Sequence, residues 1–378
     1  MAAFTEEQTM IKDQAKSWVM EQAPVQKFRE LRDSDNDTGF TADTWSAMVD
    51  MGWTGIIIPE QYGGSNLGNL TFGVVLEETG RQLTASPLLA SALVGASAIL
   101  LGGSEAQKQA WLPKIVDGSA ILTLAVDETP RHAPEQVALQ AEKTGDGFTL
   151  TGSKTFVMEG GEATALIVAA RSSGSPGETH GITLFVVPAD SSGITRTPLK
   201  TADSRGYANV DFKGVKVDAD AVLGDVDEGH AVLDATLDRA RAGLAAEMLG
   251  TAAQAFDMTM EYLKTRKQFG QVIGSFQALG HRAAGLFTEM ELARSCVEAA
   301  LQGIDSGAKD IDQLCSLSKC KAGDFLHHAS NELIQIHGGI GMTDEFDAGF
   351  YLKRARAVEA AFGNQAFHRN RYAKLLGF

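Results

Sequence analysis

The feature that most constrains the fold is a hydrophobic period that changes twice along the chain. From Thr5 to about residue 118, apolar residues recur at helical spacing, and Thr5 followed by two glutamates has the pattern of a helix N-cap. Between about 120 and 222, short β-branched segments bounded by Gly, Pro or Asp follow one another at regular intervals. That pattern predicts an antiparallel sheet or barrel.

After Gly229 the period of 3.6 returns in long stretches without proline, at 229–265, 275–303, 310–337 and 346–361. Antiparallel packing into a four-helix bundle is the natural arrangement for helices of this length. The expected fold class is therefore α+β multidomain, with an N-terminal helical domain at 1–118, a central antiparallel β domain at 119–226 and a C-terminal four-helix bundle at 227–378.

Composition excludes several classes of protein. With 44% hydrophobic and 21% charged residues and a mean hydropathy of -0.07, the chain has the composition of a globular protein. The net charge of -15 argues against nucleic acid as a partner, because phosphate binding needs clustered Lys and Arg. No run approaches the roughly 18 apolar residues of a membrane span.

The cysteines and the first residues bear on the compartment. Cys296, Cys315 and Cys320 form neither a disulfide framework nor a metal-ligand spacing. The first residues are acidic and lack the apolar core of a signal peptide. We therefore expect a cytoplasmic protein that binds no metal.

The segment RKQFG, at 266–270, closes one expected helix, and GSFQ at 274–277 opens the next. Arg266 near a helix C-terminus is favourable on structural grounds alone. The alternative is a turn that presents Arg266 and Gln268 to a ligand phosphate, since Arg gives directional, charge-assisted hydrogen bonds to pyrophosphate.

A glycine-rich segment, IQIHGGIGMTDEFD at 334–347, separates two helices. Gly338, Gly339 and Gly341 allow a ligand to approach the backbone closely. The segment is not the dinucleotide fingerprint, because it follows a helix and its third spacing is wrong. His337 is either a ligand or a structural histidine, and the second role is the more common one.

The third feature is LDRARAGLAAEMLG at 237–250, on the first helix of the bundle. Glu247 has apolar neighbours along the chain, and a carboxylate in an apolar pocket has the raised pKa that a general base needs. The structural alternative is a glutamate at the helix surface or in a salt bridge.

Together these segments closely resemble the acyl-CoA dehydrogenase family over essentially the whole chain. The matching segments are DMGWTGIIIPEQYGG, GSEAQKQAWLPKIVDGSA, GYANVDFKGVKV, RKQFGQVIGSFQ and QIHGGIGMTDEFDAGFYLKRA. The resemblance implies the three domains above, usually packed as a tetramer, with FAD between the β domain and the bundle.

The resemblance also implies roles for individual residues. It places Asp238 and Arg241 beside the CoA and acyl groups, and it implies flavin contacts from a larger set: Arg266, Gln268, Phe269, Gln335, Gly338, Gly339 and Asn364. Phe156 stands where the family has a tryptophan that shields the flavin, and Met158 where it has a threonine that hydrogen-bonds it. Met offers no donor.

The chain departs from the family at the catalytic base. Phe362 and Ala240 occupy the two positions where members carry that glutamate. Glu247 lies two turns beyond Ala240 on nearly the same helix face, about 10 Å along the axis, and is the remaining candidate. Glu345 and Asp347 come next, although N-capping or pairing with Arg354 or Lys353 explains them equally well.

A second departure is the loop that covers the flavin in the family. It reads AVDETPRHAPEQ here and lacks the usual Ala-Gly-Ser.

Three interpretations of the function follow from these matches and departures. The chain is a competent dehydrogenase that passes electrons to an electron-transfer flavoprotein, acting on fatty acyl or on branched, cyclic or steroid-derived acyl groups. Alternatively, it is the half-site subunit of a heterotetramer with a homologous chain. A flavin oxidase or monooxygenase on the same fold is a third interpretation.

Overall fold

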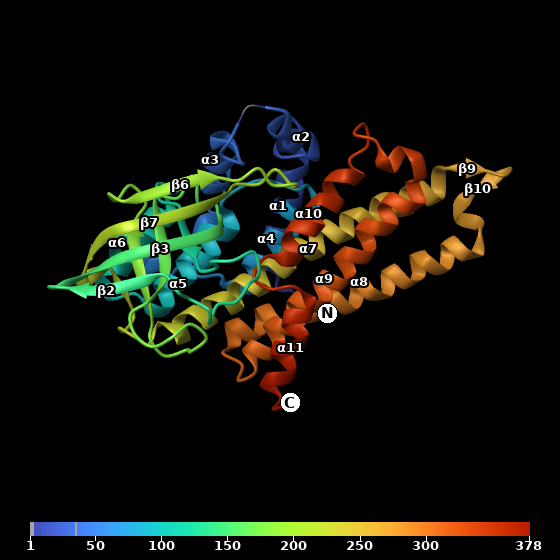
Figure 1. Ribbon diagram of the computed structural model, residues 1–378. Coiled ribbons are helices and arrows are strands. Elements are labelled where there is room, and N and C mark those ends of the chain that lie inside the picture. Colours follow the sequence, from blue (N-terminus) through green and yellow to red (C-terminus); the bar gives the residue numbers. More distant parts are fainter. Residues whose placement is uncertain (1–3, 35) are drawn as a thin grey trace. The chain divides into compact units, whose positions relative to one another are not determined.

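The computed structural model describes residues 4–34 and 36–378. The chain folds into two compact units (Figure 1). The helical unit comprises 1–29, 69–84 and 241–378, and the sheet unit comprises 30–68 and 85–240. Helix α7, Gly229–Thr265, is 37 residues long and is divided between the units. Its residues up to Ala240 belong to the sheet unit, and those from Arg241 onward belong to the helical unit.

The helical unit is built from long helices joined by short connections. Its C-terminal helices are α7, α8 (Gln277–Ser306), α9 (Ile311–His337), α10 (Ala348–Ala360) and α11 (Gln365–Leu375). Helix α9 packs against α8, α10 and α11. The N-terminal helices α1 (Glu6–Gln22), α2 (Val25–Asp33) and α4 (Gly68–Arg81) belong wholly or mainly to this unit as well.

Helices α4 and α7 approach each other as closely as main chains allow. A Cβ atom on Gly80 would lie 2.3 Å from the carbonyl oxygen of Glu247, and one on Gly250 would lie 1.8 Å from that of Glu77. Glycine at both positions lets the two backbones touch. The contact buries every residue of α7 from Arg241 to Gly250.

The sheet unit surrounds a sheet whose strands run in the order β6-β7-β3-β2-β4-β5-β8, with β1 pairing to β4. The strands are β1 (Leu122–Ala125), β2 (Gln140–Thr144), β3 (Gly147–Met158), β4 (Ala165–Arg171), β5 (Ile182–Pro188), β6 (Ile194–Pro198), β7 (Tyr207–Asp218) and β8 (Val222–Leu223). Strands β4 and β5 are buried at almost every position, and their side chains form the core of the sheet.

Short helices accompany the sheet. They are α3 (Ala42–Asp50), α5 (Ala96–Gly102) and α6 (Glu105–Val116), with the π-helical segment η3 at Leu88–Gly95. Strand β1 packs on η3, where a Cβ on Gly95 would lie 2.8 Å from Leu122.

Most expectations about the fold are confirmed. Thr5 caps α1 with a full capping box, and Ser104 does the same for α6. The expected antiparallel sheet needs one correction, because β1 pairs with β4 in parallel and Gln140 of β2 pairs in parallel with Arg171. A further helix, α11, follows the four that the period predicted.

Candidate functional site

Glu247 lies in the buried middle of α7, and its side chain is 12% exposed. Its carboxylate Oε1 accepts two hydrogen bonds from Arg354 of α10, from Nε at 3.0 Å and Nη2 at 2.6 Å. The Arg354 side chain is 7% exposed, so this is a buried ion pair. The side chain was predicted to lie in an apolar pocket, and the structure adds a charged partner from a distant helix.

Asp347 pairs with Arg29 of helix α2, which was not among the partners considered from the sequence. Its Oδ1 accepts from Nη2 of Arg29 at 2.6 Å, and Arg29 also donates to the main-chain carbonyl of Asp344. Arg354, one of the alternative partners considered for Asp347, donates to Glu247. Glu345, the other candidate base at this point, is exposed.

Two residues that the resemblance placed beside the substrate are buried on α7. Asp238 is 4% exposed and Arg241 is 0% exposed. The guanidinium carbon of Arg241 lies 5.8 Å from the centroid of the Phe367 ring, within range of a cation–π interaction. Arg241 thus brings a positive charge into the interior of the helical unit.

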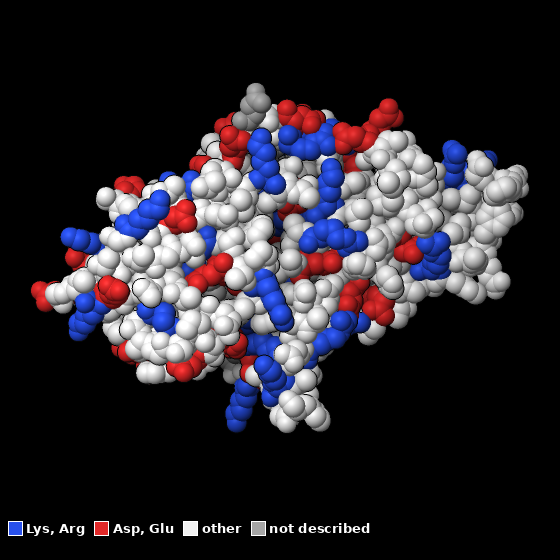
Figure 2. Space-filling view, in the orientation of Figure 1, with Lys and Arg blue, Asp and Glu red and all other residues white. Residues whose placement is uncertain are grey.

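The segment after α7 forms a small hairpin of β9 (Lys267–Gln268) and β10 (Gln271–Val272). Arg266, Gln268 and Phe269 are all exposed, and Phe269 is 90% exposed at the tip, in the left-handed region with φ 54°. Figure 2 shows this end of the helical unit as mostly uncharged surface with basic atoms at its edge.

A small apolar cluster anchors the hairpin to the end of α9. Leu263, Ile273, Ala283 and Ile336 form its buried centre, with Tyr262, Phe276 and Leu279 packed against it. Because Ile336 lies next to the last residue of α9, the cluster joins the hairpin to the helix end that leads into the glycine-rich turn. This turn is η6, Gly338–Met342.

His337 packs at the start of that turn between two aromatic rings. Its ring stacks on Tyr262 with centroids 4.1 Å apart and lies 4.6 Å from the ring of Phe346. Its Nδ1–H donates to the carbonyl of Leu333 at 2.8 Å. Burial lowers the pKa of His337, which suits a neutral ring between two aromatic rings.

The glycine turn offers open backbone. A Cβ added at Gly338 or at Gly339 would meet nothing within 4 Å, and Gln335 one turn earlier is exposed. Gly338 has φ 62° and ψ -133°, a conformation that glycine adopts with little strain. An exposed guanidinium, an exposed amide and uncovered glycine backbone are the groups that a dinucleotide phosphate and its ribose require.

The turn between α10 and α11 carries Phe362 and Asn364. Phe362 has φ 54° and Gly363 has φ 101°, so two successive residues lie in the left-handed region. The side chain of Asn364 accepts from the amide of Phe367 at 2.9 Å and caps α11.

In the sheet unit, Phe156 lies on a β-bulge between β3 and β7. Its ring is 51% exposed, its φ is 51°, and its amide donates to Oδ1 of Asn209 at 3.3 Å. Met158, two residues on, is half-buried, and its carbonyl accepts from the hydroxyl of Thr123.

Sequence reasoning missed what holds the loop after β1. Lys154, fully buried on β3, donates to the carbonyl of Val126 at 2.8 Å and to Glu128 at 2.7 Å. Glu128 also accepts from the amides of Ala138 and Leu139. Burial lowers the pKa of Lys154. The loop that lacks the family's Gly and Ser is therefore closed by a buried ion pair.

Within the helical unit, the structure groups the hairpin residues and the glycine turn around one apolar cluster, whereas Glu247 is paired in the interior. Phe156 and Met158 lie two positions apart at the end of β3 in the sheet unit. Among the residues that the structure describes, no cluster of His, Cys, Asp and Glu could hold a metal, and no helix is long and apolar enough to cross a membrane.

Family models for acyl-CoA dehydrogenases match nearly the whole chain. The N-terminal domain model matches residues 5–119, the middle domain model 131–218 and the C-terminal domain model 227–377.

Individual relatives agree with these matches. A probable acyl-CoA dehydrogenase, YngJ of Bacillus subtilis, is 30% identical over 97% of both chains. Among solved structures, the Tcur3481-Tcur3483 steroid ACAD is 30% identical over 98% of both chains, with a TM-score of 0.88. The ChsE4-ChsE5 complex from Mycobacterium tuberculosis is 28% identical, covers 100% of this chain and 99% of its own, and has a TM-score of 0.90.

The buried pair of Glu247 and Arg354 generates a stability prediction. Arg354→Met leaves the carboxylate buried without its guanidinium, and we expect a loss of about 3–5 kcal/mol in the free energy of unfolding, measured with urea. The matched control is Arg369→Met, which removes an exposed pair in which Nη2 of Arg369 donates to both carboxylate oxygens of Asp324, and should cost no more than about 1 kcal/mol.

The double variant Glu247→Gln/Arg354→Met should lose less stability than Arg354→Met alone, because no unpaired charge remains inside. Equal losses for Arg354→Met and Arg369→Met would contradict the assignment of a buried, mutually dependent pair.

Proposed function

The chain belongs to the acyl-CoA dehydrogenase family, and on that premise we propose that it catalyses FAD-dependent α,β-dehydrogenation of an acyl-CoA thioester to the trans-2-enoyl-CoA. The observation that carries the proposal is the exposed hairpin of Arg266 and Gln268 anchored on the same apolar cluster as the uncovered Gly338–Gly339 backbone. These are the groups that the family uses to hold the cofactor.

We assign the flavin-binding roles that the family resemblance implies. Arg266 and Gln268 would bind the pyrophosphate, with Phe269 and Gln335 beside it and the backbone of Gly338 and Gly339 in close approach. Asn364 would offer its amide, and Phe156 and Met158 would pack on the ring system. When bound, FAD supplies the acceptor for the hydride that leaves the β-carbon.

We assign Glu247 as the base that removes the α-proton. Both hydrogen bonds from Arg354 end on Oε1, so the proton would be taken by Oε2. The pair also fixes the orientation of the carboxylate, and positioning supplies much of the effect of a general base. The side chain keeps 12% exposure and is therefore not sealed from its surroundings.

Asp238 and Arg241 would line the space for the CoA and acyl groups, and Arg241 brings a buried positive charge there. Because a steroid ACAD aligns with 98% of the chain, we propose a bulky, steroid-derived or branched acyl group as the substrate class. Electrons would pass to an electron-transfer flavoprotein.

A second candidate function is that of a half-site subunit in a heterotetramer. The specific observations are that Ala240 is fully buried, that Phe362 stands at the other base position, and that Glu247 is engaged by Arg354. The solved ChsE4-ChsE5 complex joins two differently named chains and supports this alternative. Such a subunit would bind flavin only together with a homologous partner and would contribute no base.

The assignment of the phosphate site predicts that Arg266→Ala weakens FAD binding about ten- to hundredfold, the value of one charge-assisted hydrogen bond. Flavin content after dialysis and a fluorescence titration of the apoprotein measure this. Lys264→Ala, two residues earlier and also exposed, is the control for general loss of positive charge. Equal flavin affinity in the Arg266→Ala variant and the parent would place the pyrophosphate elsewhere.

The assignment of the base predicts that Glu247→Gln keeps FAD and assembly but lowers turnover about 10²–10⁴-fold. Gln retains a hydrogen-bond acceptor for Arg354 but not the opposite charge, so some stability is lost together with turnover. The control is Glu289→Gln, which alters a carboxylate paired with Lys321 at 2.9 Å. Unchanged turnover in the Glu247→Gln protein would remove Glu247 from the mechanism.

A further inference from the structure

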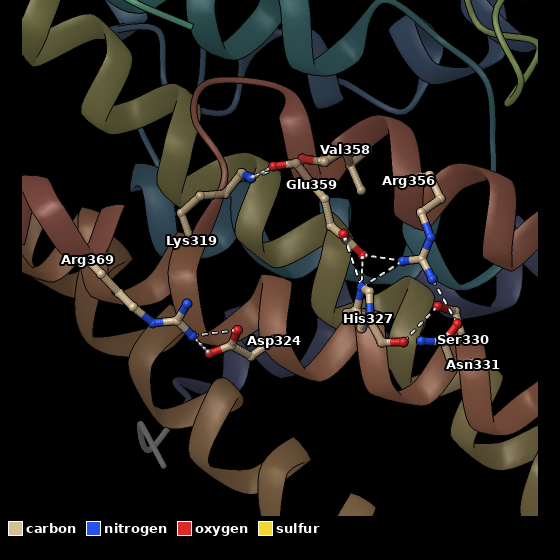
Figure 3. A network of polar contacts seen from close by, with 9 residues as sticks. All are labelled: Lys319, Asp324, His327, Ser330, Asn331, Arg356, Val358, Glu359 and Arg369. Carbon is tan, nitrogen blue, oxygen red and sulfur yellow. Dashed lines mark hydrogen bonds and ion pairs between the residues drawn. The ribbon is translucent and has the colours of Figure 1, made fainter. Parts of the chain in front are cut away.

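Lys319 is a fully buried lysine in the middle of α9, with 2% exposure. Its ammonium donates to the main-chain carbonyls of Val358 at 3.0 Å and Glu359 at 3.3 Å (Figure 3). It also donates to the carbonyl of Gly363 at 3.1 Å. Burying an ammonium is unfavourable unless its protons are hydrogen-bonded, and here one side chain has three acceptors.

Two of these acceptors belong to the last turn of α10, which ends at Ala360. The final carbonyls of a helix have no partner within the helix, and they carry partial negative charge. The third acceptor, Gly363, lies beyond the helix in the following turn. The ammonium therefore ties the end of α10 to the turn of 361–364, defined here as the Phe362 turn.

The Phe362 turn needs such support, because Phe362 and Gly363 both have positive φ, at 54° and 101°. The left-handed region is unfavourable for phenylalanine. His368 of α11, fully buried, supports the same turn by donating from Nε2 to the carbonyl of Phe362 at 3.1 Å. Two buried side chains thus hold four carbonyls at and just before this turn.

The carboxylate of Glu359 does not serve as the counter-ion in direct contact. Figure 3 shows it directed to the other side, where it accepts from Arg356 at 2.8 Å and faces His327. Because the ammonium donates to main-chain carbonyls, it restrains the position of the backbone.

We propose that Lys319 is a positioning residue of the reaction site, whose ammonium fixes the main chain of the Phe362 turn and so fixes where Phe362 and Asn364 stand. The link to the reaction site rests on the proposed function, since the resemblance puts Phe362 at a base position and Asn364 against the flavin. The link to the turn rests on the hydrogen bonds alone.

Hydrogen exchange tests the turn directly. In Lys319→Met three buried carbonyls lose their donor, and we expect amides of 360–368 to exchange about ten- to hundredfold faster than in the parent. Lys321→Met is the matched control, on the same helix but paired with Glu289 on α8. Unchanged exchange in the turn, or an equal increase throughout α8 and α9, would overturn the positioning role.

The bound flavin reports on the reaction site. Lys319→Met should alter the visible absorption band of the flavin, whereas Lys321→Met should leave it as in the parent. A loosened turn with an unaltered flavin band would overturn the claim that the turn belongs to the reaction site. A colourless parent protein would overturn the proposed function, and the exchange experiments would still decide the role of Lys319 in the turn.

Discussion

The contact between α4 and α7 is the constraint on which the helical unit depends. Gly80 and Gly250 let two main chains touch, and any side chain at either position would collide with a carbonyl oxygen. Because the backbones are this close, the α7 side chains around the contact are directed into the interior. Glu247, whose own carbonyl faces Gly80, is buried for this reason and needs a charged partner. The ion pair with Arg354 follows from the glycine contact.

Two other buried cations are also held by specific partners. Lys154 pairs with Glu128 of the loop after β1, and Lys319 donates hydrogen bonds to carbonyls at the end of α10. Each of these buried cations restrains a segment without regular structure that the family resemblance places beside the flavin or the substrate. Removing one partner of such an arrangement costs far more than removing an exposed pair, because the remaining group stays desolvated.

Sequence reasoning succeeded where the signal is local. The cap at Thr5 and the bounds of the long C-terminal helices follow from residue types a few positions apart. It failed where the deciding contact joins distant positions. Arg354 lies 107 residues from Glu247, and Arg29 lies 318 residues from Asp347, so neither pairing could be read from spacing. The left-handed turn at Phe362 was also hidden, since phenylalanine carries no preference for that conformation.

The central claim is that this chain, by itself, dehydrogenates an acyl-CoA with a bound flavin. The most direct measurement is an anaerobic titration of the protein, purified after expression alone, with a panel of straight, branched and steroid-derived acyl-CoAs while the visible spectrum is recorded. We predict a bound flavin whose visible absorption band is bleached by one class of thioester, because hydride transfer reduces the flavin. A protein that is colourless alone, and acquires a reducible flavin only when co-expressed with a homologous subunit, would contradict the claim.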